Sequence, residues 1–217
     1  MAVVRHINFF ELQKACAEPG CPLCGIVTRR ADRYMDNLLF EHVSDRGFRA
    51  AYRAAGGFCD YHSRGLSSYR DGLAVAILGR DILLDRIASF KKNKAWKPKD
   101  RCPVCLERER IETEYLGFLS GADADDPSKA DEHELRVAFQ ASDGFCAPHY
   151  AGLLEKAKRI PRWLREFQER KFDELLSRTS TFIEYSAYGR QEEFNALSEK
   201  DKIVWKELAV ALRGELG

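Results

Sequence analysis

The chain has 217 residues, of which 45% are hydrophobic and 32% charged, and its 35 basic and 34 acidic side chains leave a formal net charge of +1. This is the composition of an ordinary globular protein, and the length allows one domain or two small ones with a buried core. The balanced charge lacks the overall basic excess that is typical of proteins that bind nucleic acid. We therefore expect a protein partner and no binding to DNA or RNA.

The first twenty residues contain only short apolar pieces, interrupted by Arg5, His6, Glu11 and Lys14. This pattern matches neither a secretory signal nor a membrane span. The chain also has seven cysteines, several of them in C-x-x-C pairs. Such pairs favour metal or redox chemistry in a reducing compartment over structural disulfides. We expect a cytoplasmic protein that does not contact a membrane.

Apolar residues recur at helical spacing through most of the chain, and no stretch shows the sustained alternation of a strand. Taken in chain order, these helical patterns cover residues 25–43, 48–55, 72–92, 105–119, 134–142, 161–185 and 200–216. A further helix is expected at the N-terminus, and the last one should begin at about Ser198, a residue type that favours helix starts. The fold class is therefore all-α.

Two sequence motifs occur twice in the same order. "CPLC" begins at Cys21 and "CPVC" at Cys102, while "FRAAYRAAGGFCDYHSRGL" from Phe48 aligns without a gap with "LRVAFQASDGFCAPHYAGL" from Leu135. This self-similarity predicts a tandem repeat of two metal-clipped helical units with about four helices each, plus N- and C-terminal helices. The corresponding domains are residues 1–95 and 96–190, with the C-terminal helix in 191–217 packed on them.

The repeated motifs have the spacing of metal ligands. Two cysteines in C-x-x-C can reach one ion, and C-x-x-H adds a sulfur and an imidazole nitrogen. Pairing the motifs within each repeat gives two sets of three cysteines and one histidine, suited to two structural zinc ions. The first set is Cys21, Cys24, Cys59 and His62; the second is Cys102, Cys105, Cys146 and His149.

Iron–sulfur clusters are the alternative cofactor. Cys16, Cys21 and Cys24 follow the C-x4-C-x2-C spacing of plant-type ferredoxins, with Cys59 available as a fourth ligand. The second repeat, however, has Lys97 where a counterpart of Cys16 would stand. We therefore place Cys16 outside the repeated ligand sets, while clusters held by three cysteines and one histidine stay open.

No catalytic constellation accompanies these motifs: the chain lacks a nucleotide-binding glycine loop, G-x-S-x-G and H-E-x-x-H. A zinc site with four protein ligands leaves no position for a reacting water. The sequence thus favours a metal-binding helical adaptor or regulatory protein without its own catalysis. An iron–sulfur electron-transfer or redox-sensing subunit is the alternative, and an enzyme with an open metal or thiol site is a third class.

The paired "CPLC…GFCDYH" and "CPVC…GFCAPH" segments resemble an uncharacterised bacterial family of helical proteins that carry C-P-x-C and F-C-x-x-H motifs. The resemblance covers about residues 15–180. It implies no established activity, but it supports the eight proposed metal ligands.

Overall fold

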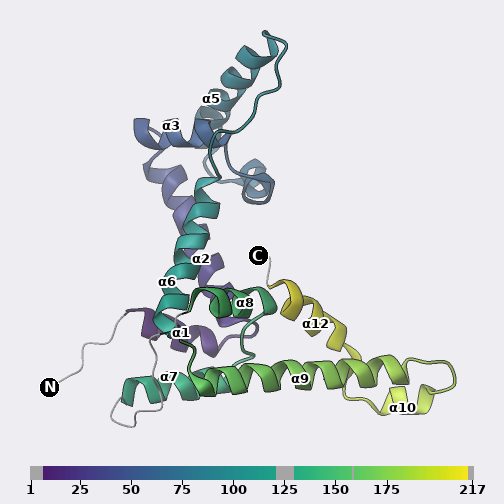
Figure 1. The fold of residues 1–217 in the computed structure, drawn as a ribbon. Helices are drawn as coiled ribbons and strands as arrows, with labels where there is room; N and C mark the ends of the chain where they lie inside the picture. Colours follow the sequence, from purple (N-terminus) through teal and green to yellow (C-terminus); the bar gives the residue numbers. More distant parts are fainter. Residues whose placement is uncertain (1–6, 121–129, 158, 215–217) are drawn as a thin grey trace. The chain divides into compact units, whose positions relative to one another are not determined.

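The computed structural model describes residues 7–120, 130–157 and 159–214, with the side chains of all of these except 120 and 130–132. Every regular element in this part of the chain is helical, which confirms the all-α prediction (Figure 1). The elements are α1 (Ile7–Cys16), α2 (Pro22–Glu41), α3 (Arg46–Ala55), α4 (Asp60–Ser63), the 3-10 turn η1 (Arg64–Ser68), α5 (Gly72–Phe90), α6 (Pro103–Ser120), α7 (Ala130–Ala141), α8 (Ala147–Lys156), α9 (Arg162–Tyr185), α10 (Gln191–Ala196), α11 (Glu199–Lys202) and α12 (Val204–Arg213).

The helices form two compact units. The central unit is residues 27–111, and the terminal unit combines residues 1–26 with 112–217. The boundaries fall inside α2 and α6, so the chain leaves the terminal unit along one long helix and returns along another. This division does not follow the bounds at residues 95 and 190 expected from the repeat, and the repeat itself stays a prediction.

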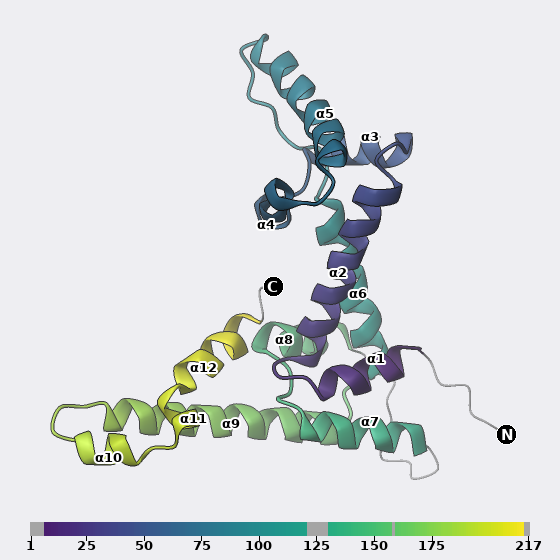
Figure 2. The same cartoon turned by 180° about the vertical axis from the view of Figure 1, so that it is seen from behind.

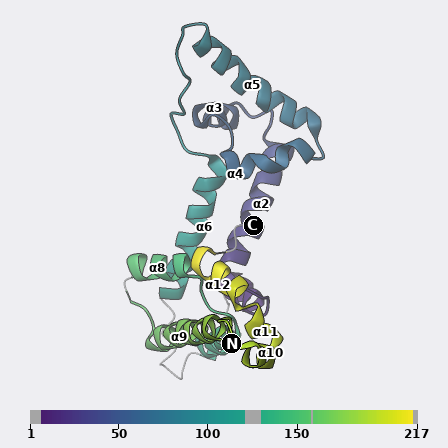
Figure 3. The ribbon, with the colours of Figure 1, turned by 90° about the vertical axis from the view of Figure 1, so that its right-hand side faces the viewer.

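The central unit packs α3 against α5 (Figure 3). Helix α3 begins where Asp45 accepts a hydrogen bond from the backbone N–H of Phe48, a common N-cap arrangement. From the next turn, the Arg49 guanidinium donates two hydrogen bonds of 2.8 Å to the carboxylate of Asp81, which is buried on α5. The apolar core beneath these helices is formed by Ala31, Leu38, Leu39, Val43, Tyr52, Phe58, Ala74, Leu78 and Val104.

The terminal unit has an aromatic core centred on Phe139 of α7. Its ring lies 4.9 Å from that of Phe145 and within 6.1 Å of those of Trp163 and Phe167 on α9. Figure 2 shows α1 lying beside α7, and α12 packs against both α8 and α9. The apolar burial therefore gathers the N-terminal helix, the C-terminal helix and α7–α9 into one unit.

The C-terminal helix expected from about Ser198 is present as two pieces. The Ser198 hydroxyl accepts a hydrogen bond of 3.1 Å from the backbone N–H of Asp201 at the start of α11, and α12 follows after a break at Ile203. Among the described helices, none is long and apolar enough to cross a membrane.

Candidate metal centres

Each C-P-x-C motif lies at the start of a long helix. The first residue of α2 is Pro22 and that of α6 is Pro103, the position where a missing backbone N–H costs no helical hydrogen bond. The carbonyls of Cys21 and Cys102 accept hydrogen bonds from the N–H groups four residues later, at 3.2 and 3.1 Å. Both cysteines of each motif thus lie at the positive end of a helix dipole, which stabilises a thiolate.

Each G-F-C-x-x-H motif forms a corner that opens a further helix. Cys59 is the N-cap of α4 and Cys146 that of α8, and the glycine two residues earlier has a positive φ of 96° and 80°, respectively. The histidine follows one turn later on the same helical face. As a result, Nδ1 of His62 and of His149 lies 3.2 Å from the sulfur of its own motif.

The eight predicted residues come together in two groups that could each hold a metal ion. In each group the three Sγ atoms and the histidine nitrogen lie within 4.8 Å of one another. Site A lies in the terminal unit and site B in the central unit. Site A is Cys21, Cys24, Cys146 and His149; site B is Cys59, His62, Cys102 and Cys105.

The pairing of the motifs differs from the sequence prediction, which was wrong on this point. Each C-P-x-C motif meets the C-x-x-H motif of the other predicted repeat and not its own. The reason is the length of α2: the 17 residues that follow Cys24 in this helix carry the chain about 25 Å along the helix axis before Cys59 is reached. The Sγ atom of Cys59 instead lies 3.6 Å from the Sγ atom of Cys105, at the start of α6.

The sulfur and nitrogen atoms of the two sites are closely spaced. In site A, Nδ1 of His149 lies 3.4 Å from both Cys21 Sγ and Cys24 Sγ, and the latter lies 3.6 Å from Cys146 Sγ. In site B, Nδ1 of His62 lies 3.5 Å from the sulfurs of Cys102 and Cys105. Since every cysteine of the chain is a free thiol, no disulfide accounts for this convergence.

The two sites differ in burial. All four residues of site A are buried, whereas Cys59 and Cys105 of site B are half-buried. Site A is also covered by the end of α12, where Gly214 has a φ of +76°. A Cβ atom at that position would lie 3.2 Å from Cys24 Sγ and 3.3 Å from Cys146 Sγ, so the close approach requires glycine.

The electrostatics of site A favour a positive charge at its centre. Burial lowers the pKa of His149, but its contacts with Cys146, Cys21 and Cys24 and with Glu112 raise the pKa by more. A Glu112 carboxylate oxygen lies 3.7 Å from Nε2, on the side of the ring away from the sulfurs. A carboxylate at the outer nitrogen orients an imidazole whose other nitrogen binds a cation.

Site B has a different outer environment. The pKa of His62 is lowered, first by burial and then by the charge of Arg108. Nε2 of His62 is buried, and no polar atom of the described residues hydrogen-bonds to it. Burial and the neighbouring thiols Cys59 and Cys102 raise the pKa of Cys105 to about 12. A cation bound between these sulfurs would offset the charge of the Cys105 thiolate and so favour it.

Two further contacts hold the corner of site A in place. Gln168 is fully buried on α9; its side chain accepts a 2.7 Å hydrogen bond from the Phe145 N–H and donates a 2.9 Å bond to the Phe145 carbonyl. The Asp143 carboxylate accepts a 2.8 Å hydrogen bond from the N–H of Gly20, next to Cys21. Sequence reasoning missed Gln168, Asp143 and Gly214 because none belongs to a repeated motif.

Cys16 belongs to neither site. It is buried at the end of α1, and desolvation is the largest factor that raises its pKa to about 12. A buried thiol with this pKa behaves as a small apolar side chain at neutral pH. Cys16 is thus not among the residues that the structure brings together in the two groups.

Comparison with known proteins gives one relative to report. The chain is similar to the "uncharacterized 23.9 kDa protein in xynA 3′ region" of Caldicellulosiruptor sp. (strain Rt8B.4), with 29% identity over 182 residues, covering 79% of this chain and 84% of that protein. The name of that protein assigns no function to it. This agrees with the resemblance drawn from the paired motifs. No family model and no solved structure matches the chain.

The crossed pairing can be tested by counting bound metal in double variants. We expect Cys21→Ser/Cys146→Ser to lose one site and keep the other, because both residues belong to site A. Cys21→Ser/Cys59→Ser should lose both sites, since it removes one ligand from each. Metal per chain is measured after dialysis against a competing chelator, with Cys16→Ser as the control that keeps both sites. The reverse result for the two double variants would restore pairing within the repeats.

Proposed function

We propose that the chain is a zinc-stabilised helical adaptor or regulatory protein without its own catalysis, with one structural zinc ion in each site. The observation that carries this proposal is the spacing of the ligand atoms. Bond lengths of about 2.3 Å to sulfur and about 2.0 Å to nitrogen in a tetrahedral zinc site place two sulfurs about 3.8 Å apart, and a sulfur and a nitrogen about 3.5 Å apart. The distances of 3.2 to 3.6 Å in both sites are close to these values.

The same spacing is less compatible with an iron–sulfur cluster. In a cluster the protein ligands are divided among two or four irons joined through bridging sulfides, so ligand atoms on different irons lie farther apart than the ligands of a single ion. Here all four ligand atoms of each site lie within 4.8 Å of one another. Three thiolates and one imidazole also complete a tetrahedral zinc site, with no position for a water to react. This supports a structural role and not hydrolysis.

An exposed apolar surface supports the adaptor role. Helix α5 of the central unit leaves an apolar stripe open to solvent, with Leu73 72% and Phe90 58% exposed at its two ends. The stripe is Leu73, Leu83, Leu84, Ile87 and Phe90. Apolar side chains repeated along one helical face mark an interaction surface for another protein. Free thiolate ligands require a reducing compartment, so we place this interaction in the cytoplasm.

Metal analysis of the purified protein tests the zinc assignment. We expect colourless protein with about two zinc ions per chain, and removal of the zinc by a chelator should lower the melting temperature, because ligand binding to the folded state stabilises it. Brown protein with iron and acid-labile sulfide after anaerobic purification would contradict the proposal and favour an electron-transfer or redox-sensing subunit.

The α5 surface is tested with a charge placed in its centre. We expect the parent chain to recover a protein partner from cell extracts and Leu84→Asp to lose it, while the variant retains two zinc ions and the helical circular dichroism of the parent. Val137→Asp, at a 53% exposed position on α7, is the matched control and should keep the partner. Equal recovery of the partner by both variants would exclude the α5 stripe as the binding surface.

A further inference from the structure

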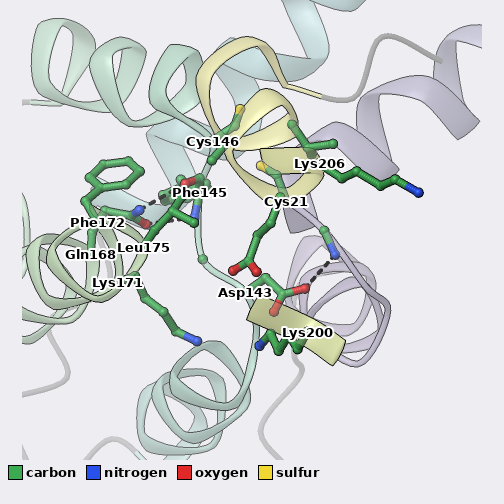
Figure 4. A pocket seen from close by; sticks show the side chains of 15 residues that line it. Cys21, Asp143, Phe145, Cys146, Gln168, Lys171, Phe172, Leu175, Lys200 and Lys206 are labelled. Atoms are coloured by element: carbon green, nitrogen blue, oxygen red, sulfur yellow. Dashed lines mark hydrogen bonds between the residues drawn. The ribbon is translucent and has the colours of Figure 1, made fainter. Parts of the chain in front are cut away.

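The terminal unit contains a cavity of about 450 Å³ beside site A. It is bounded by α9, by α11 and α12, and by the corner that carries Cys146, while Cys21 contributes to its inner end (Figure 4). The volume lies within the range of about 300 to 1,000 Å³ typical of small-molecule sites. A single unit therefore provides the whole cavity wall.

The cavity wall is largely apolar. Phe172 and Leu175 contribute from α9, Val210 and Ala211 from α12, and Phe145 from the corner. Helices α9 and α12, which carry the first four of these side chains, pack against each other, and Leu175 is buried. Such a wall favours the hydrocarbon part of a ligand, because apolar surface on both molecules is removed from water.

The wall carries Lys171, Lys200 and Lys206 together with the carboxylates of Asp143 and Glu207. Glu207 is paired with the Arg178 guanidinium at 2.8 Å, whereas Asp143 accepts a hydrogen bond from the uncharged N–H of Gly20 and keeps its charge. Lys171 and Lys200 against Asp143 therefore leave one positive charge at the Asp143 end of the cavity. The lysines of the wall, in contrast, form no salt bridge with any residue that the structure describes. Figure 4 shows the amino groups of Lys171 and Lys200 at the end of the cavity where Asp143 lies, whereas that of Lys206 points away.

From this arrangement we infer that the cavity is a binding site for a small amphipathic carboxylate. The hydrocarbon chain of the ligand lies against the apolar side chains of α9 and α12, and its carboxylate accepts hydrogen bonds from the ammonium groups of Lys171 and Lys200. Charge-assisted hydrogen bonds of this kind are stronger than neutral ones, and two of them orient the ligand. The site takes one ligand molecule per chain and is independent of the α5 surface.

Calorimetric titration of the full chain with its bound metal tests the ligand class. Decanoate, below its micelle concentration, should bind with one molecule per chain, and octanoate more weakly by on the order of tenfold, because two buried methylenes are lost. Decylamine, which has a similar chain and the opposite charge, should not bind at the same concentrations. No binding of decanoate, or equal binding of decylamine, would overturn the inference.

Variants locate the binding site. Lys171→Gln/Lys200→Gln should weaken decanoate binding by about tenfold, since both charge-assisted contacts are replaced by neutral ones. Lys206→Gln is the matched control and should change the affinity less than twofold. Ala211→Phe should abolish binding by filling the cavity. Circular dichroism and metal content verify that each variant is folded. Decanoate binding that is insensitive to all of these changes would be adsorption elsewhere, which contradicts the inference.

Discussion

The two sites depend on one arrangement: the start of a long helix meets a cysteine–histidine corner from a distant part of the chain. In site A the paired residues are 122 to 128 positions apart, and in site B they are 40 to 46 apart. The ligands of site A come from both segments of the terminal unit, one before and one after the central unit in sequence. An ion at site A would therefore join the two segments that the chain must bring back together.

This arrangement has an entropic consequence. The cost of closing a loop rises with the logarithm of its length, so closure across site A costs about 1 kcal/mol more than closure across site B. Apolar packing around Phe139 and the hydrogen bonds of Gln168 to Phe145 contribute to offsetting that cost in the terminal unit. Because such a site does not exist in the unfolded chain, an ion bound in site A would add to the stability of the folded unit.

The sites have the same ligand types but different surroundings. Site A is buried, is covered by Gly214, and has Glu112 at the outer nitrogen of its histidine. Site B has two half-buried sulfurs, at Cys59 and Cys105, and within the described chain the outer nitrogen of its histidine has no hydrogen-bonding partner. The sulfurs of site B are therefore the more accessible to chelators and thiol reagents.

The sequence predicted the longer helices and the eight clustered residues, whereas α4, α8 and α10 fall outside the helical ranges expected from it. The C-P-x-C and C-x-x-H motifs marked the eight residues, because each motif has ligand spacing and occurs twice in the same order. The motifs alone do not show which C-x-x-H motif each C-P-x-C motif meets. That pairing depends on how far the long helix α2 carries the chain. Gln168 and Gly214 were also hidden: their roles arise from packing against residues far away in the sequence, and no local pattern marks them.

The central claim is that each C-P-x-C motif would share an ion with the C-x-x-H motif of the other predicted repeat. Through-bond NMR on the cadmium-substituted protein tests it most directly. Cadmium-113 takes the same thiolate and imidazole ligands as zinc, and its coupling to cysteine Hβ protons identifies which cysteines share an ion. Two cadmium signals are expected, one coupled to Cys21, Cys24 and Cys146 and the other to Cys59, Cys102 and Cys105. A signal shared by Cys21, Cys24 and Cys59 would contradict the account.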